Sequence, residues 1–252
     1  MKSGRNSSPF FVLGCVRSGT TLLRDLLRLH PHLECPEETH FFRWPDPYAS
    51  PRFMHPYTQN KFIKKQREMD GISEQEFIHL IETSNSRSEL AEAYGNLFLK
   101  KQNNPHGRWF DKTPQNIYGI LLISRLMPDS RFIHIHRNPL NVVASLLQGK
   151  VLSATGITDA ISYWCEAMVI MNEYKRIAAY RVLEVSYEHL TSDPLGSMTT
   201  ILQFLEENPD DYVLPDKFVH GEYNKYLDTL SEQQIKEVKQ RCRPYYSMYG
   251  YE

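Results

Sequence analysis

A short apolar run that leads through glycines into a helical pattern is the feature that most constrains this fold. Phe10 to Leu13 has the length and composition of a buried strand. The next apolar residues recur at helical spacing, with charged residues on the opposite face: Leu22, Leu23, Leu26 and Leu27. The turn between such a strand and such a helix can bind an anion, because the free N–H groups of the helix N-terminus point toward the turn.

The turn between this strand and this helix reads GCVRSGTT, residues 14–21. Its spacing matches the nucleotide-binding pattern GxxxxGK[ST], except that Thr20 stands in the place of the lysine. In NTPases that lysine neutralises the β- and γ-phosphates. Here the positive charge lies earlier, at Arg17, which suits a ligand without a γ-phosphate. A turn whose glycines serve geometry alone is the alternative, but this loop offers more anion donors than such a turn needs.

The remaining chain alternates short apolar runs with helical patterns, which predicts an α/β fold with a parallel sheet flanked by helices. The stretch from Pro31 to Pro56 holds six prolines and is expected to be a long functional loop. We expect one domain, 1–252, with a flexible N-terminus over residues 1–9. The other expected elements are strands at 108–111, 131–136 and 182–185, and helices within 60–102 and at 157–178, 193–207 and 231–241.

Charge and cysteine content narrow the class of protein. Lys and Arg total 29 and Asp and Glu total 30, a balance that argues against binding nucleic acid or an anionic membrane. The four cysteines form no CxxC pair, and no apolar run is long enough for a signal peptide or a membrane span. We therefore expect a cytoplasmic protein with free thiols. No cluster of Cys and His has metal-ligand spacing, so no metal is expected.

Together with Leu22 and Leu23, the glycine loop resembles the 5′-phosphosulfate loop of sulfotransferases that use 3′-phosphoadenosine 5′-phosphosulfate (PAPS). Downstream, Arg137 at the end of a predicted strand is followed eight positions later by Ser145, which resembles the 3′-phosphate motif of the same family. A guanidinium binds phosphate in a bidentate way, which agrees with that role. The resemblance implies a P-loop nucleoside-kinase-like sulfotransferase fold, with PAPS as donor and 3′,5′-adenosine bisphosphate (PAP) as product.

Further segments resemble the tyrosylprotein sulfotransferase branch in particular. Cys35–Thr39 matches the segment that carries the catalytic glutamate of that branch, and the match falls on Glu38. On pattern alone either Glu37 or Glu38 could be the base, and only the resemblance favours Glu38. The segments 110–114 and 182–190 match those of a catalytic lysine, here Lys112, and of a tyrosine near the adenosine, here Tyr187.

The resemblance implies an in-line transfer of a sulfonate group from PAPS to an acceptor hydroxyl. Glu38 would be the general base, with Lys112 and Arg17 stabilising charge around the transferring group. The remaining donor-site residues would be those of the loop and of the downstream motifs: Ser18, Gly19, Thr20, Thr21, Arg137, Ser145 and Tyr187. Lys217 or Lys225 could also reach the 3′-phosphate.

The chain departs from the tyrosylprotein branch at several points. His40 stands where that branch has an arginine, and neither a membrane anchor nor disulfide pairing is expected. A small molecule, lipid or saccharide is therefore expected as acceptor, in preference to a protein tyrosine. Two other functions stay open: a small-molecule kinase with a degenerate P-loop, which would need ATP and Mg²⁺, and a non-catalytic nucleotide-binding protein, which would need neither Glu38 nor Lys112.

Overall fold

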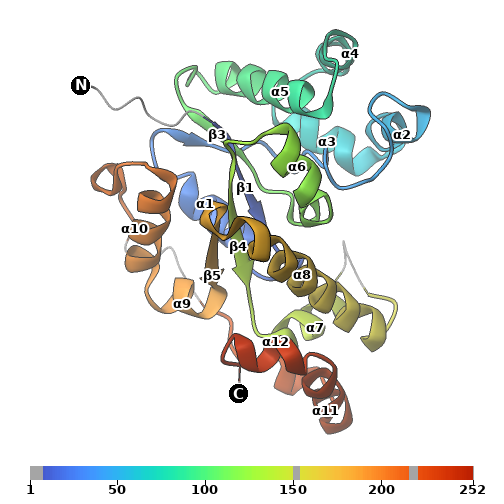
Figure 1. Ribbon diagram of the computed structural model, residues 1–252, viewed down its shortest axis with the longest axis vertical. Coiled ribbons are helices and arrows are strands. Elements are labelled where there is room, and N and C mark those ends of the chain that lie inside the picture. Colours follow the sequence, from blue (N-terminus) through green and yellow to red (C-terminus); the bar gives the residue numbers. More distant parts are fainter. Residues whose placement is uncertain (1–7, 150–153, 216–220, 252) are drawn as a thin grey trace.

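The chain is built around a five-stranded parallel sheet with the order β2-β3-β1-β4-β5 (Figure 1). The computed structural model describes residues 8–149, 154–215 and 221–251. In order along the chain, the strands are β1 Phe10–Leu13, β2 Leu33–Glu34, β3 Arg108–Asp111, β4 Arg131–His136 and β5 Val182–Ser186. The predicted α/β fold with a parallel sheet is confirmed. Most of the predicted flexible N-terminus, 1–7, lies outside the described residues.

Register places the residues that follow the strands along one edge of the sheet. Leu13 pairs with His134, and His136 pairs with Ser186, so β4 and β5 end at the same level, two residues beyond the end of β1. Strand β3 pairs with β1 in the same direction. In parallel α/β sheets ligands bind at the carboxyl ends of the strands. The residues that come next in the sequence are Gly14, Lys112, Arg137 and Tyr187.

Helices cover both faces of the sheet because the central strands β1, β3 and β4 bury both of their faces. Phe10 and Val12 belong to a core formed with α1 and α10, while Phe11 and Leu13 belong to a core formed with α7 and α8. Figure 1 shows α1 and α10 on one side of the strands and α8 on the other. The helices are α1 Thr20–Leu27, α2 Pro51–Gln59, α3 Lys61–Met69, α4 Glu74–Thr83, α5 Arg87–Lys101, α6 Ile120–Leu126, α7 Pro139–Leu147, α8 Ile157–Ala178, α9 Tyr187–Ser192, α10 Pro194–Leu205, α11 Glu232–Arg241 and α12 Arg243–Met248.

The sequence predicted a long loop from Pro31 to Pro56, but this stretch is not continuous loop in the structure. It contains β2 and most of α2, and Pro56 lies inside that helix. Pro51 occupies the first turn, where a missing N–H costs nothing, and the Ser50 side chain caps the helix by accepting from the Phe53 N–H. Phe53 and Tyr57 are buried in an aromatic cluster, so packing outweighs the hydrogen bond that Pro56 removes.

Local capping interactions begin several of the helices. Ser73 and Glu76 form the reciprocal capping box that begins α4. The Asn138 side chain accepts from the Leu140 N–H, with Pro139 as the first residue of α7. Helix α8 covers the predicted range 157–178. None of the helices in the described ranges is both long enough and apolar enough to cross a membrane.

The aromatic C-terminal segment packs against the outer part of the sheet. Tyr251 hydroxyl lies 2.5 Å from His136 Nδ1, and Tyr249 hydroxyl donates to Glu184 Oε1 at 2.5 Å. Tyr251 is buried, and the His136 and Tyr249 rings lie 4.3 Å apart. The segment therefore holds the ends of β4 and β5 in place. His136, which it contacts, is the residue before Arg137, and Glu184 lies three residues before Tyr187.

Candidate active site

The loop between β1 and α1 has the backbone of a phosphate-binding turn. Gly14 and Gly19 adopt positive φ values of 154° and 96°, which residues with a side chain rarely adopt. A Cβ at Gly19 would lie 2.3 Å from Tyr187 Cδ2, so the loop packs closely against the start of α9. Arg17 also has a positive φ, of 71°. The Ser18 hydroxyl is fully buried and has no hydrogen-bond partner among the described residues.

The two residues expected to bind the 3′-phosphate, Arg137 and Ser145, both contact the loop. Arg17 Nε donates to Ser145 Oγ at 2.8 Å, and Arg137 donates to the Arg17 carbonyl at 3.5 Å. The Arg137 guanidinium lies 4.1 Å from the centre of the Tyr187 ring. Arg137 Nε is buried without a partner in the described part of the chain. Unpaired donors at Ser18 and Arg137 fit a nucleotide with phosphates at both ends, such as PAP.

Contacts around Arg137 keep it at the end of β4. The Trp164 indole N–H donates to the Arg137 carbonyl at 3.0 Å, and the guanidinium donates to the Glu222 carbonyl at 2.6 Å. The Glu222 N–H donates to the Tyr187 hydroxyl at 3.1 Å. Of the two late lysines considered, Lys225 is exposed and paired with Glu222, and Lys217 lies outside the described residues.

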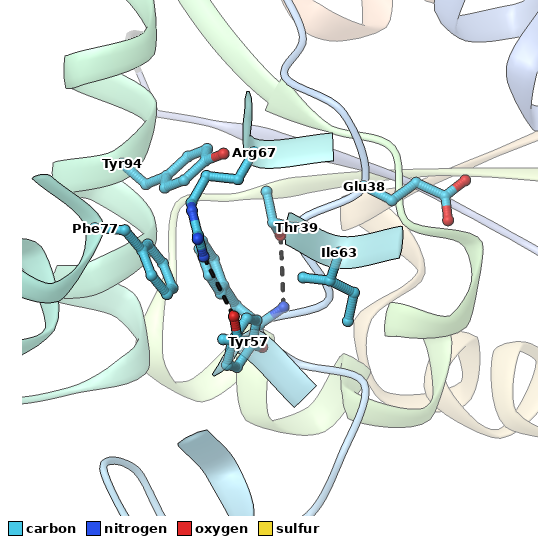
Figure 2. A pocket seen from close by; sticks show the side chains of 8 residues that line it. Glu38, Thr39, Tyr57, Ile63, Arg67, Phe77 and Tyr94 are labelled. Atoms are coloured by element: carbon cyan, nitrogen blue, oxygen red, sulfur yellow. Dashed lines mark hydrogen bonds between the residues drawn. The ribbon is translucent and has the colours of Figure 1, made fainter. Parts of the chain in front are cut away.

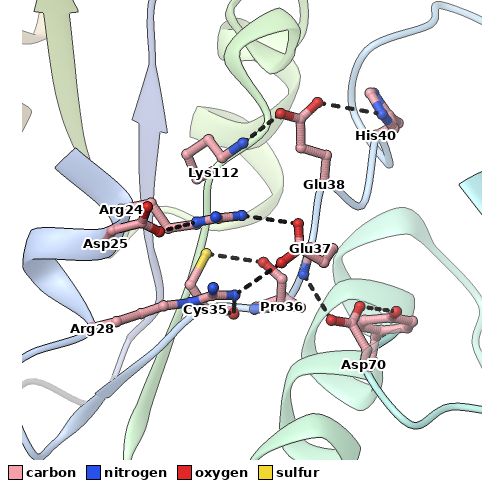
Figure 3. A network of polar contacts seen from close by, with 11 residues as sticks. Arg24, Asp25, Arg28, Cys35, Pro36, Glu37, Glu38, His40, Asp70 and Lys112 are labelled. Atoms are coloured by element: carbon pink, nitrogen blue, oxygen red, sulfur yellow. Dashed lines mark hydrogen bonds and ion pairs between the residues drawn. The ribbon is translucent and has the colours of Figure 1, made fainter. Parts of the chain in front are cut away.

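The Glu38 and Lys112 side chains point toward one another, as Figure 3 shows. Lys112 Nζ contacts Glu38 Oε1 at 2.5 Å; the lysine side chain is buried and that of Glu38 is 22% exposed. Glu37 points elsewhere and pairs with Arg24 at 2.9 Å and Arg28 at 3.5 Å. Of the two adjacent carboxylates, the structure brings only Glu38 to Lys112.

A cavity of about 400 Å³ extends from the phosphate loop to Glu38. Its polar wall combines the phosphate loop with the glutamate segment: Arg17, Thr20, Thr21, Glu38, His40 and Arg43. Its apolar wall includes Val16, Phe62, Ile63 and Pro114. Such a mixture of apolar surface and convergent polar groups is typical of a site for a small ligand or a single side chain.

A second, much smaller cavity lies behind Glu38 (Figure 2). Its volume is about 10 Å³, which is room for no more than one water molecule. Aromatic rings of Tyr57, Phe77 and Tyr94 fill this side, and Arg67 donates to the Tyr57 carbonyl at 3.4 Å. The Glu38 carboxylate points away from these rings in Figure 2. Of these two cavities among the described residues, the larger one gives an acceptor room to reach Glu38.

His40 is buried and uncharged. Burial, with the nearby charges of Arg43 and Lys112, lowers the pKa of its imidazole to about 3. Its Nε2 lies 3.7 Å from Glu38 Oε2. His40 therefore does not supply the positive charge of the arginine that it replaces, whereas Arg43 lines the same cavity and does. Sequence reasoning missed Arg43, although a basic residue among aromatic ones in a functional segment was an available signal.

Two buried aspartates near Glu38 were also missed by sequence reasoning. Asp111 accepts hydrogen bonds from the Thr39 hydroxyl and from Asn116 Nδ2, the latter at 3.1 Å. Asp70 accepts from the Glu37 N–H at 2.8 Å. Burial raises the pKa of each carboxyl to about 6. Both hold the segment around Glu38 in place, and nothing local in the sequence marks them.

Within the described ranges, no group of three or more His, Cys, Asp or Glu side chains could hold a metal ion. That the reaction needs no metal stays a prediction.

The fold and site define an α/β protein with a phosphate-binding loop and a glutamate–lysine pair at the carboxyl edge of its sheet. The family model described as the sulfotransferase family matches residues 9–211, and the chain belongs to that family. Relatives include protein-tyrosine sulfotransferase 2 of Gallus gallus, 28% identical over 90% of this chain and 60% of its own length. Protein-tyrosine sulfotransferase 1 of Danio rerio is also 28% identical, over 94% of this chain and 68% of its own length. This chain thus spans only part of the curated relatives that it matches.

Solved structures with a similar fold are sulfotransferases as well. The sulfotransferase domain from the curacin biosynthetic pathway superposes with a TM-score of 0.65 at 18% identity, covering 98% of this chain and 99% of that one. A mouse sulfotransferase complexed with PAP superposes with a TM-score of 0.53 at 15% identity, covering 94% and 84%. At these identities the likeness shows the fold, and the sulfotransferase fold expected from the sequence is confirmed.

The expectation that a small molecule, lipid or saccharide is preferred over a protein tyrosine is wrong. Relatives that match 90% and 94% of the chain are protein-tyrosine sulfotransferases. The expectation depended on His40 and on the further expectation that the protein has neither an anchor nor disulfides. An anchor and disulfides affect where a protein resides and how stable it is, but they do not shape an acceptor pocket. Arg43 keeps a positive charge in the cavity where His40 does not.

Proposed function

We propose that this protein transfers the sulfonate group of PAPS to the phenolic hydroxyl of a tyrosine in a peptide or protein. The observation that carries the proposal is that Glu38 faces the same cavity as Arg17, Thr20 and Thr21 of the phosphate loop, with Lys112 beside it. A general base and a set of anion donors at one cavity are what group transfer to a hydroxyl requires.

The donor site would use both phosphate-binding regions. The loop N–H groups, with the Ser18 hydroxyl and Thr20 and Thr21 at the start of α1, would hold the 5′-phosphate. Arg137 and Ser145 would hold the 3′-phosphate, the guanidinium in bidentate contact. The Tyr187 ring, close to Arg137, would line the adenosine side.

In the chemical step, Glu38 would accept the proton of the phenol as its oxygen forms a bond to sulfur. The bond between sulfur and the oxygen of the 5′-phosphate breaks at the same time, and PAP leaves with that electron pair. Lys112 and Arg17 would stabilise the negative charge that develops on the leaving phosphate. An ammonium has three N–H donors, so Lys112 can keep its contact to Glu38 while it reaches the donor.

A phenolic acceptor suits the cavity and the relatives. Phe62, Ile63 and Pro114 offer apolar surface opposite the polar wall, which fits an aromatic ring with its hydroxyl directed at Glu38. The matching relatives are named as protein-tyrosine sulfotransferases, which supports the same acceptor.

The first experiment is calorimetric titration with PAP, with 5′-AMP and ATP–Mg²⁺ as controls. Tight binding of PAP and weak binding of both controls is expected. Transfer of radiolabelled sulfonate from PAPS to a tyrosine peptide is then measured, with the same peptide carrying phenylalanine as a blank. Preference for ATP–Mg²⁺ would support the kinase alternative. Binding of PAP without transfer to the peptide would support a non-catalytic nucleotide-binding protein and contradict the proposed activity.

A further inference from the structure

We infer that Glu37 is a positioning residue, which sets the place of Glu38 relative to the phosphate loop through an ion pair with helix α1. The inference rests on the proposed function, in which Glu38 is the general base. The two glutamates are neighbours in sequence, but their carboxylates have different partners, as Figure 3 shows. Glu38 contacts Lys112, and Glu37 contacts Arg24 and Arg28.

The arginines connect Glu37 to the donor site. Helix α1 begins at Thr20, within the phosphate loop, and Arg24 lies about one turn further along it. Arg24 is itself oriented by Asp25, at 2.9 Å from its Nε, and its side chain is only 12% exposed. Since a helix is rigid over one turn, the contact from Arg24 to Glu37 transmits the position of the phosphate loop to the glutamate segment.

The backbone of Glu37 is held from the opposite direction. Its N–H donates to Asp70 Oδ1 at 2.8 Å, and Asp70 Oδ2 accepts from the Tyr94 hydroxyl at 2.6 Å. Asp70 is buried at the end of α3, and Tyr94 belongs to α5. Arg28 also donates to the Cys35 carbonyl, at 3.1 Å.

Glu37 is therefore fixed by its side chain on α1 and by its N–H on Asp70. With both ends of the residue held, the backbone places the next side chain at Lys112 and the cavity. A general base acts only within hydrogen-bond reach of the proton that it takes, so a small displacement of Glu38 lowers turnover without altering the donor site.

The test compares two acceptor peptides that differ in their phenol. One carries tyrosine and the other tetrafluorotyrosine, whose phenol is already ionised at neutral pH and needs no general base. The variants are Glu37→Gln and Arg24→Gln, with Glu38→Gln as the reference for loss of the base. Glu173→Gln is the matched control, because Glu173 lies in an exposed ion pair with Arg176.

On the tyrosine peptide we expect kcat to fall about 10-fold in Glu37→Gln and in Arg24→Gln, less than the about 100-fold or more expected from loss of a general base. KM for PAPS should stay unchanged. On the fluorinated peptide, kcat of both variants should be close to the wild-type value. Because Glu37→Gln already removes the contact to Arg24, the double variant is no slower than Glu37→Gln alone. Wild-type kcat in Glu37→Gln, or an equal loss on both peptides, would overturn the inference.

A readout that does not depend on activity separates this inference from the proposed function. In protein labelled with ¹³C at glutamate carboxyls, the Glu38 resonance should move in Glu37→Gln and in Arg24→Gln, but not in Glu173→Gln. Absence of any movement would refute the positioning role. If wild-type protein sulfonates neither peptide while the resonance still moves, the proposed function fails and the positioning of Glu38 by Glu37 stands.

Discussion

Arg17 Nε donates a hydrogen bond to Ser145 Oγ at 2.8 Å, and these residues lie 128 positions apart in the sequence. The contact joins the phosphate loop to α7, so one serine is shared between the two halves of the proposed nucleotide site. We expect Ser145→Ala to lower the affinity for PAP about 5- to 10-fold, the equivalent of one hydrogen bond worth about 1 kcal/mol. The affinity for 5′-AMP, which has no 3′-phosphate, should change much less. Equal losses for both ligands in calorimetric titration would contradict this role.

Arg137 should contribute more binding energy than Ser145. Loss of a charge-assisted contact to phosphate costs about 2 kcal/mol or more, so Arg137→Ala should weaken PAP binding by about 30-fold or more. Arg137→Lys should lie in between, because an ammonium keeps the charge but cannot bind in a bidentate way. Unchanged PAP affinity in the alanine variant would show that the 3′-phosphate binds elsewhere.

Glu38→Gln should lower kcat by about 100-fold or more, because the amide cannot accept the proton of the acceptor. The dissociation constant of PAP should stay at the wild-type value, since Glu38 is not among the donor-site residues. Steady-state kinetics with a tyrosine peptide and calorimetry with PAP measure the two quantities separately. Turnover near the wild-type rate in Glu38→Gln would exclude this residue as the base.

Gly19→Ala should impair the phosphate loop through a clash. Its Cβ would lie 2.3 Å from the Tyr187 ring, at a residue with a φ of 96°. Gly71→Ala is a matched control, because Gly71 also has a positive φ, of 73°, but a Cβ there meets no atom within 4 Å. Both variants should lose about 1 kcal/mol of stability from backbone strain. Only Gly19→Ala should also weaken PAP binding, and an equal effect of the two on PAP affinity would rule out the clash.

His136 should make the stability of the fold depend on pH. Burial, together with the neighbouring His134, lowers the pKa of His136 to about 3 in the folded state, against about 6.5 in the unfolded chain. The unfolded state therefore binds the proton more tightly, and stability is lost as the pH falls from about 6.5 toward 3. The difference in unfolding free energy between wild type and His136→Gln should shrink by about 2 kcal/mol between about pH 7 and pH 5. A difference that does not change with pH, measured by denaturant titration, would mean that this histidine is not held uncharged.

Much of the fold was predictable because its signals are local. The strand from Phe10 to Leu13, the glycine loop that follows it and the helix at 157–178 all depend on residues close in sequence. Helix α2 was not predictable in this way. Its stability comes from the packing of Tyr57 against the distant Phe77 ring and of the distant Arg87 over the Phe53 ring, which overrides the local effect of Pro56.

The phosphate loop could be identified from the sequence, since a strand, two glycines and a helix start specify its backbone within a dozen residues. The choice between Glu37 and Glu38 could not be made from the residues alone. Both are carboxylates in an irregular segment, where no helical or strand period assigns a face. Only the tertiary structure shows that the two carboxylates have different partners, because the arginines of α1 hold Glu37 and the buried end of β3 brings Lys112 to Glu38. The sequence thus determines that two carboxylates are present in this segment. The direction of each side chain depends on partners that the chain brings together only when it folds.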